Sequence, residues 1–104
     1  MDKLKLVYAP RAQRDLMRLP KRNALQVLED LELLETRPWP AGKVKKLRGL
    51  DCLEIKTGDF RTIFLPQKDR AVILRVVNRR DLEQAIDRID VSALKQWLSG
   101  LQQK

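Results

Sequence analysis

Ten residues around a Gly-Asp pair, IKTGDFRTIF (55–64), constrain the fold of this chain more than any other segment. Apolar and polar residues alternate on both sides of Gly58-Asp59, which is the pattern of two antiparallel strands joined by a two-residue loop. Glycine suits such a loop because it accepts a positive φ. The loop also fixes the register, and it predicts that Lys56 and Arg61 lie directly opposite each other.

The predicted register gives the hairpin an apolar face and a charged face, because successive side chains of a strand point to opposite sides. The apolar face carries Leu53, Ile55, Phe60 and Phe64, and the charged face carries Glu54, Lys56, Arg61 and Ile63. We expect the apolar face to pack on helices. Like charges directly opposite each other destabilise a strand pair, so Lys56 and Arg61 either spread into solvent or hold an anion between them.

Hydrophobic periodicity predicts the rest of the fold. The predicted elements are a strand over 3–8, helices over 11–20 and about 21–36, strands at about 44–57, 60–66 and 71–77, and helices beginning near Asp81 and near Asp90 or Ser92. The strand over 44–57 is interrupted near 48–51. This order indicates an α+β fold: a small antiparallel sheet with an N-terminal helical hairpin packed on one face and a C-terminal helix. We expect all helices on that one face.

Composition limits the class of protein and of partner. The length of 104 residues suits one domain over residues 1–104, and 22 Lys+Arg against 14 Asp+Glu give a net charge of +8. This excess favours a polyanionic partner, namely a nucleic acid, an acidic protein segment or anionic lipid; the alternative is a basic protein without such a partner. We expect no signal peptide and no membrane span, and the single cysteine fits a reducing cytoplasm.

The chain contains no histidine, which excludes a histidine general base and a histidine-ligated metal. Since there is also only one cysteine, we expect neither a metal nor another cofactor. Acid–base chemistry is then left to Asp, Glu, Lys, Cys52 or the only tyrosine, Tyr8. We nevertheless expect Cys52 to be a small buried side chain, and Tyr8, Trp39 and Trp97 to serve packing.

Further basic residues lead into and out of the predicted sheet. The segment KVKKLRG (43–49) precedes the hairpin, and NRRD (78–81) follows the last strand. In a small antiparallel sheet both segments can lie beside Lys56, and arginine suits phosphate because its planar fork donates two hydrogen bonds. Glu54, on the charged face, is expected either to form a salt bridge or to act as a general base.

Two longer stretches, KKLRGLDCLEIKTGDFRTIF and VILRVVNRRDLEQAI, resemble the RelE/ParE superfamily of bacterial toxins from toxin–antitoxin modules. The shared pattern is a Lys-Leu-Arg-Gly segment, a strand, a Gly-Asp-aromatic-Arg turn, an apolar strand and a basic pair that opens the last helix. An early A.RDL.RLP helix fits as well, so the resemblance covers nearly all of the chain. In this superfamily RelE-like members cleave messenger RNA at the ribosome, whereas ParE-like members poison DNA gyrase.

The resemblance implies that Lys56, Arg61 and Arg79 match basic catalytic positions of the ribonuclease branch. The basic segment with Lys46 and Arg48 matches too, and the candidate RNA-binding residues are Lys45, Lys46, Arg48 and Arg80. Two positions depart from the pattern. Glu54 stands where RelE-like enzymes often carry a second lysine, and Glu83 or Ala85 stands where they carry a late tyrosine.

The resulting hypothesis is an mRNA interferase, a metal-independent endoribonuclease in which the RNA 2′-OH attacks its own phosphate. Arg61 and Arg79 hold phosphate oxygens, Lys56 stabilises charge and Glu54 accepts the proton. The alternatives are a ParE-like gyrase inhibitor and a non-catalytic relative that binds only an antitoxin or nucleic acid. In every case we expect an acidic antitoxin that lands on the leucine-rich helices (11–35) and the C-terminal helix.

Overall fold

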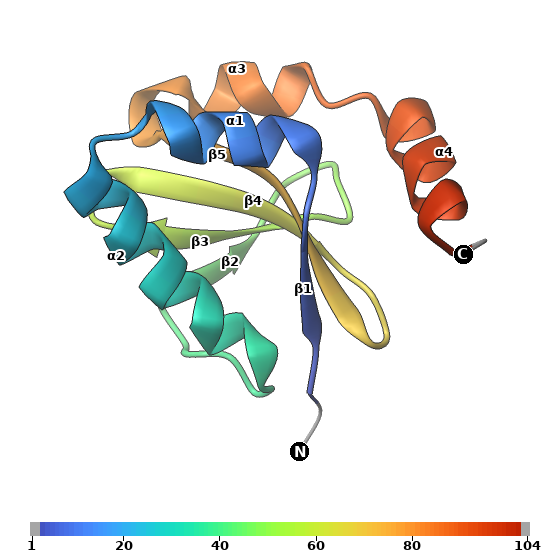
Figure 1. Cartoon of the computed structure of the whole chain (residues 1–104), viewed down its shortest axis with the longest axis horizontal. Helices are drawn as coiled ribbons and strands as arrows, with labels where there is room; N and C mark the ends of the chain where they lie inside the picture. Colours follow the sequence, from blue (N-terminus) through green and yellow to red (C-terminus); the bar gives the residue numbers. More distant parts are fainter. Residues whose placement is uncertain (1–2, 103–104) are drawn as a thin grey trace.

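A computed structural model describes residues 3–102 of the chain, with the backbone alone for Val91. Within these residues, five strands, four α-helices and two short 3₁₀ turns follow one another (Figure 1). The strands are β1 (Lys5–Tyr8), β2 (Val44–Lys46), β3 (Leu53–Thr57), β4 (Phe60–Pro66) and β5 (Arg70–Asn78). The helices are α1 (Pro10–Arg18), α2 (Lys21–Leu31), α3 (Leu82–Asp87) and α4 (Val91–Gln102), and the 3₁₀ turns are η1 (Glu32–Glu35) and η2 (Arg79–Asp81). These elements confirm the predicted order, including the interruption between β2 and β3.

The helix ends follow local sequence signals. Pro20 lies between α1 and α2, because a proline inside a helix lacks the backbone N–H donor and clashes with the preceding turn. At the start of α4, the Asp90 carboxylate accepts a hydrogen bond from the Ala93 N–H at 3.0 Å, so Asp90 rather than Ser92 is the cap. Asp81 occupies the capping position of α3, but its side chain makes no capping hydrogen bond.

The strands form one sheet in the order β1-β5-β4-β3-β2. Strands β2 to β5 are antiparallel neighbours, as expected, but β1 pairs with β5 in parallel, from Lys5 opposite Arg70 to Tyr8 opposite Ile73. The expectation of a purely antiparallel sheet was therefore wrong at this edge. A parallel pair needs a long crossover, and the whole chain between β1 and β5 supplies it. Because β1 pairs only with residues 70–73, no strand within residues 3–102 lies beside the rest of β5 on that side.

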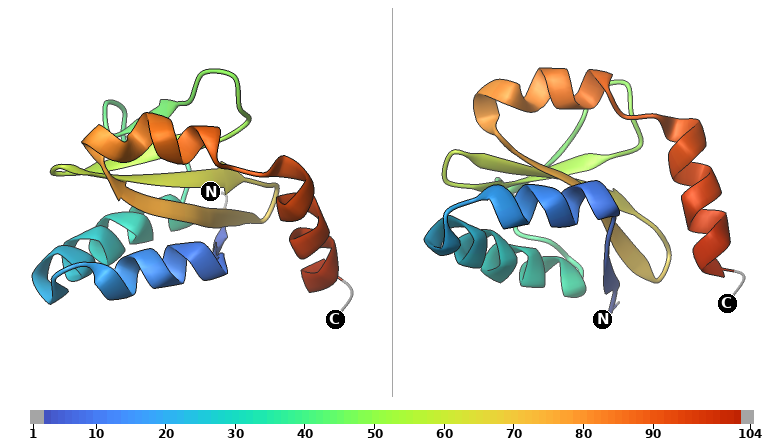
Figure 2. Two further views of the ribbon diagram at one scale, coloured as in Figure 1. Left: turned by 90° about the horizontal axis from the view of Figure 1, so that it is seen from above. Right: turned by 45° about the horizontal axis from the view of Figure 1, so that its top comes forward.

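Helices cover both faces of the sheet, so the expectation that they share one face was also wrong (Figure 2). Helices α1 and α2 pack on one face, around a cluster that includes Ala12, Val27, Leu31, Ile55, Phe64 and Ile73. Helices α3 and α4 pack around a second cluster that includes Ile63, Val72, Leu74, Val77, Ala85 and Leu98. The second cluster arises because β5 is apolar on both sides, which buries it between two layers.

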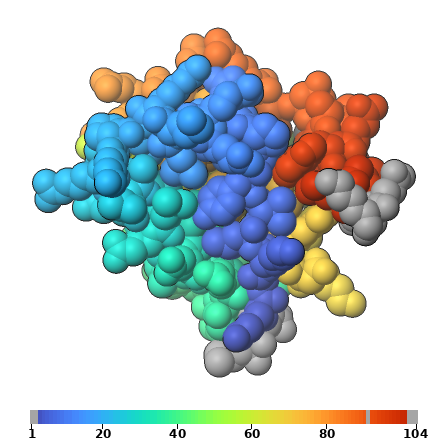
Figure 3. Space-filling model, in the orientation of Figure 1, coloured from blue at the N-terminus to red at the C-terminus, as the bar shows by residue number. Residues whose placement is uncertain are grey.

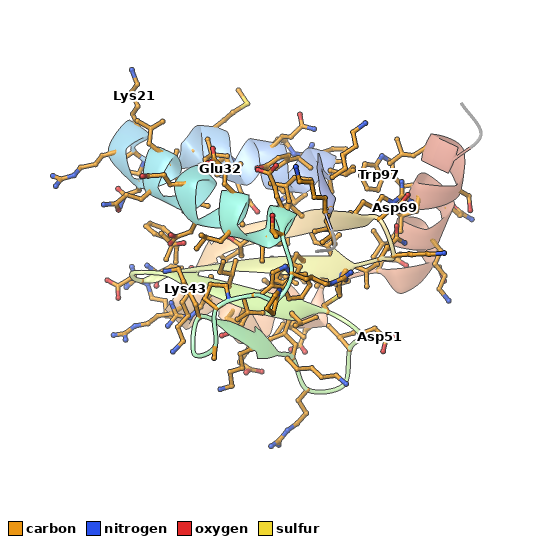
Figure 4. All side chains as sticks on the ribbon, turned by 90° about the horizontal axis from the view of Figure 1, so that it is seen from below. Lys21, Glu32, Lys43, Asp51, Asp69 and Trp97 are labelled. Atoms are coloured by element: carbon orange, nitrogen blue, oxygen red, sulfur yellow. The ribbon has the colours of Figure 1, made fainter. Side chains whose placement is uncertain are left out.

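Helix α4 lies beside the end of the sheet, apart from the other helices (Figures 1 and 3). Leu98 of α4 is buried, and Trp97 points toward the body of the protein (Figure 4), as expected for a packing role. Trp39 packs edge-on against Phe64, with ring centroids 5.3 Å apart, and Tyr8 is half-buried in the first cluster. Among residues 3–102, no helix is long and apolar enough to cross a membrane.

Candidate active site on the β3–β4 hairpin

The hairpin has the register that its loop predicts. The opposed pairs are Lys56 with Arg61, Glu54 with Ile63, Ile55 with Thr62 and Leu53 with Phe64. Gly58 has a φ of +57°, as in a type II′ turn, which places glycine first in the loop. Because Ile55 and Phe64 are buried in the cluster under α2, the charged face turns to the opposite side of the sheet.

Charged side chains consequently gather on that opposite face. Lys45 of the edge strand β2 pairs with Glu54, Glu54 and Lys56 are two residues apart on β3, and Lys56 pairs with Arg61 of β4. Paired residues and residues two apart along a strand share a face. Arg79 joins them at the loop, because its backbone N–H donates to the loop backbone at 2.8 Å. We refer to Lys45, Glu54, Lys56, Arg61 and Arg79 as the hairpin cluster.

Arg61 is the most enclosed cation of the hairpin cluster. Its Nη1 donates to the carbonyl oxygens of Gly58 and Phe60, both at 2.9 Å, and its Nε lies 3.7 Å from Glu54 Oε1. The side chains of Arg61 and Glu54 are only 14% and 7% exposed. Among residues 3–102, nothing accepts a hydrogen bond from Nη2 of Arg61, and nothing donates one to the Glu54 carboxylate. The guanidinium is therefore held in place while part of its donor fork stays available to an anion.

The other cations of the hairpin cluster are exposed. Lys45 and Lys56 have no ion-pair partner in the described part of the chain. Arg79 Nε lies 3.8 Å from Asp59 Oδ1, and their side chains are 67% and 73% exposed, so this pair is weak. Arg80 follows on the surface, with its backbone N–H bonded to the Asn78 side chain at 3.2 Å. These side chains can turn toward a ligand at little energetic cost.

Two of the candidate RNA-binding residues lie away from the hairpin cluster. Lys46 pairs with Leu53, which packs against the first core cluster, so Lys46 points to the face covered by α1 and α2. Arg48 lies in the loop between β2 and β3, at the end of β3 that is remote from Lys56. Lys45 and Lys46 are neighbours on β2, so their side chains point to opposite faces of the sheet. Arg48 precedes β3 and the hairpin loop follows it, so the two lie at opposite ends of that strand.

The hairpin is anchored to α2 by contacts of Asp30 that were not predicted from the sequence. Thr57 Oγ1 donates to Asp30 Oδ2 at 2.7 Å, and Lys43 Nζ lies 3.1 Å from the same oxygen. The Lys56 N–H also donates to the Lys43 carbonyl at 3.0 Å. The available signal was the position of Asp30 directly before the buried Leu31, because a carboxylate beside a buried stripe requires a partner.

Neither Tyr8 nor Cys52 belongs to the hairpin cluster. Burial raises the pKa of the Tyr8 hydroxyl, and the nearby carboxylates of Glu35 and Glu32 raise it further. Burial also raises the pKa of the Cys52 thiol, with a smaller effect from Asp51. Both groups therefore stay protonated at neutral pH.

Several solved proteins with this arrangement of strands and helices are toxins of toxin–antitoxin pairs. The complex RelBE2 from Mycobacterium tuberculosis matches 75% of this chain and 93% of the solved chain, with 26% identity and a TM-score of 0.65. The RelE–RelB complex from Pyrococcus horikoshii matches 74% and 96%, with 27% identity and a TM-score of 0.64. Free RelE from E. coli shares the fold over 85% and 99%, at 22% identity and a TM-score of 0.66. The fold therefore places the chain among the RelE-like toxins as a structural class.

Sequence comparison narrows the class to a family. RelE1 of Methanocaldococcus jannaschii, named as a toxin, is 35% identical over 75 residues, which cover 68% of this chain and 83% of that protein. The family model for the ParE toxin of type II toxin–antitoxin systems (parDE) matches residues 6–83, a span that contains the whole hairpin cluster. The chain belongs to the RelE/ParE superfamily and is a toxin of a toxin–antitoxin module.

Proposed function

We propose that this protein is a metal-independent endoribonuclease that cleaves messenger RNA at the ribosome. In the proposed reaction the 2′-oxygen forms a bond to the adjacent phosphorus and loses its proton, while the bond to the 5′-oxygen breaks and that oxygen gains a proton. The products are a 2′,3′-cyclic phosphate and a 5′-hydroxyl. Because the nucleophile is part of the substrate, the protein needs only to orient the phosphate, stabilise its charge and move protons.

Each member of the hairpin cluster has a role in this reaction. Arg61 and Arg79 bind the non-bridging phosphate oxygens, and Lys56 stabilises the charge that develops on them. Glu54 accepts the proton of the 2′-OH; no described residue donates a hydrogen bond to its carboxylate, and its ion pair with Arg61 is long, at 3.7 Å. Lys45 binds the RNA backbone on the same face.

One observation carries this proposal: Lys56 and Arg61 lie directly opposite each other with Glu54 beside them. Two cations in this position destabilise the strand pair, and a phosphate between them removes the repulsion. The similarity to RelE1 of M. jannaschii and to RelE from M. tuberculosis supports the ribonuclease branch.

The direct test is cleavage of messenger RNA on purified, programmed ribosomes, with the new 3′ ends mapped by primer extension. Replacing Arg61→Ala should lower the cleavage rate by about 100-fold or more, as expected when one donor to a developing anion is lost. RNA with a 2′-deoxy nucleotide at the cleavage site should remain intact. Circular dichroism establishes that the variant is folded.

Adjacent lysines on β2 provide a matched control. Lys45→Ala removes a cation from the reactive face and should lower the rate about fivefold, the effect of losing roughly 1 kcal/mol. Lys46→Ala removes the same charge from the other face and should stay within about twofold of wild type. Wild-type cleavage by Arg61→Ala, or equal effects of the two lysine variants, would contradict the proposed site.

A ParE-like inhibitor of DNA gyrase is the second candidate function. The specific observation that favours it is the match to the ParE family model over residues 6–83. The Arg61–Glu54 contact fits it as well, because a binding protein needs no free base. Supercoiling by purified gyrase separates the two functions: an inhibitor blocks supercoiling and leaves ribosome-bound RNA intact, and the ribonuclease does the reverse.

An acidic antitoxin is the proposed protein partner. The net charge of +8 supports it, as do the antitoxin complexes of the RelE relatives from M. tuberculosis and P. horikoshii. The outer surface of α1, α2 and the following turn η1 also exposes large apolar side chains, namely Met17 (84%), Leu25 (55%), Leu28 (36%) and Leu33 (43%). Co-expression with the product of the neighbouring reading frame should yield a stable complex that suppresses toxicity.

A further inference from the structure

A groove between α1 and α3 follows the part of β5 that β1 leaves without a neighbour. Helix α1 lies on one face of the sheet and α3 on the other, with β5 between them (Figure 2). The cavity between them has a volume of about 460 Å³. It is separate from the cation pair of the hairpin, because Lys56 and Arg61 do not line it.

The groove has an apolar floor and a cationic rim. Its apolar lining comes from Leu19, Phe60, Val76, Val77 and Ala85. Its charged lining consists of four arginines, Arg11, Arg18, Arg75 and Arg88, against two aspartates, Asp15 and Asp81. The arginines outnumber the aspartates, so the groove favours an anionic occupant.

One aspartate of the groove is already neutralised by its surroundings. Asp15 Oδ2 accepts hydrogen bonds from Arg75 Nε at 2.8 Å and from the Val76 N–H at 2.9 Å, and Arg11 Nε lies 3.6 Å from its other oxygen. The Asp15 carboxylate thus accepts the hydrogen bond from the Val76 N–H that a neighbouring strand would otherwise accept on this edge of β5. The edge is therefore chemically suited to carboxylates.

The rim arginines remain free to bind a ligand. Arg18 and Arg88 are exposed, and neither has an ion-pair partner among residues 3–102. They come from α1 and from the residue after α3, so they stand on the two sides of the groove. An occupant that lies along the groove can reach both.

We propose that this groove binds an acidic segment of the antitoxin, one in which apolar side chains alternate with carboxylates. The apolar side chains cover the floor, and the carboxylates meet Arg18 and Arg88. A nucleic-acid backbone fits less well, because it would place desolvated phosphates over Val76, Val77 and Ala85. The inference rests on the proposed antitoxin partner, and it specifies where and through which chemistry that partner is held.

The test compares two charge-reversal variants with equal changes of net charge. The groove variant is Arg18→Glu with Arg88→Glu. The control is Lys5→Glu with Lys68→Glu, both exposed, outside the groove and outside helices α1 and α2. Binding is measured for the protein encoded by the neighbouring reading frame, and separately for a labelled peptide of alternating glutamate and leucine. A peptide of alternating lysine and leucine and a short single-stranded RNA are the comparison probes.

The groove variant should bind the neighbouring gene product and the Glu–Leu peptide at least about tenfold more weakly than wild type, and the control less than about threefold more weakly. The peptide should also shift the amide resonances of Val76, Val77 and Ala85. Equal affinities of the two variants, or RNA shifting these amides more than the Glu–Leu peptide does, would overturn the inference. If the neighbouring gene product does not bind at all, the proposed partner is wrong, and the peptide measurement still decides the chemistry of the groove.

Discussion

Two arginine–carboxylate pairs in this protein have the same chemical groups but are held very differently. On the inner side of α1, the Asp15 carboxylate accepts hydrogen bonds from Arg75 and from the Val76 backbone, with the closest contact at 2.8 Å. On the hairpin, Glu54 lies 3.7 Å from Arg61 and receives no hydrogen bond from the described residues. Both carboxylates are similarly enclosed, with side chains 8% and 7% exposed, so burial does not explain the difference.

The contrast separates a structural pair from the pair that we propose to be reactive. A carboxylate whose lone pairs are occupied joins two elements, and here it connects α1 to the open edge of β5. A carboxylate that lies near cations without hydrogen bonds can accept a proton or give up its arginine to a stronger anion. The number of hydrogen bonds to each carboxylate, rather than the presence of an ion pair, thus distinguishes the two regions.

The largest expected effect comes from breaking the structural pair. Replacing Asp15→Ala leaves Arg75 and the Val76 N–H without their acceptor in a nearly buried position, and it should lower the free energy of unfolding by about 3 kcal/mol. Urea denaturation measures this loss. The control Arg11→Ala removes only the outer contact at 3.6 Å and should change stability by less than about 0.5 kcal/mol.

The anchor of the hairpin should have the next largest effect. Thr57→Val keeps the shape of the side chain but removes its hydrogen bond to Asp30, which should lower the free energy of unfolding by about 1 to 1.5 kcal/mol. Amide hydrogen exchange should then accelerate in β3 and β4 more than in β5. Uniform acceleration across the sheet would show that Asp30 stabilises the whole fold rather than the hairpin.

A smaller loss of stability is expected at the Arg61–Glu54 pair. Glu54→Gln keeps the size of the side chain and removes a charge at 3.7 Å from Arg61, so the free energy of unfolding should fall by about 0.5 to 1 kcal/mol. The cleavage rate should fall by a much larger factor than this small loss of stability would explain, because the variant lacks the proposed general base. A loss of stability as large as that of Asp15→Ala would erase the distinction between the two regions.

The smallest effect is expected at the tip of the hairpin. Asp59→Asn removes the charge facing Arg79, but both side chains are mostly exposed and the Arg79 Nε–Asp59 Oδ1 distance is 3.8 Å. The free energy of unfolding should therefore change by less than about 0.5 kcal/mol. Binding of a short RNA should tighten slightly because Arg79 loses a competing carboxylate, and fluorescence anisotropy can measure the change.

The hairpin could be predicted from the sequence because its signals are local. Gly58 fixes the loop, and strict alternation on both sides fixes which residues face each other, so the opposition of Lys56 and Arg61 followed directly. The same alternation separates Lys45 from Lys46, but this required knowing that β2 pairs with β3 at Glu54. Basic residues farther from the loop in the sequence, such as Lys45, join the hairpin cluster only through strand pairings that the sequence does not specify.

Contacts between distant segments could not be predicted in the same way. The parallel pairing of β1 with β5 joins segments that lie far apart in the sequence, and no local pattern indicates it. Asp15 carried a partial signal, since its spacing from Ala12 and Leu19 places it on the buried side of α1. Its partner Arg75 is far away in sequence, so the ion pair and the groove above it emerge only in the folded structure.

The pairing of the first strand with the last has a consequence for synthesis of the protein. Lys5 finds its partner only after Arg70 has been made, so the sheet cannot be completed while most of the chain is still being translated. The arginine that follows β5 arrives later still. The cation cluster of this toxin is therefore complete only after Arg79 has been made, so a shorter nascent chain lacks part of it.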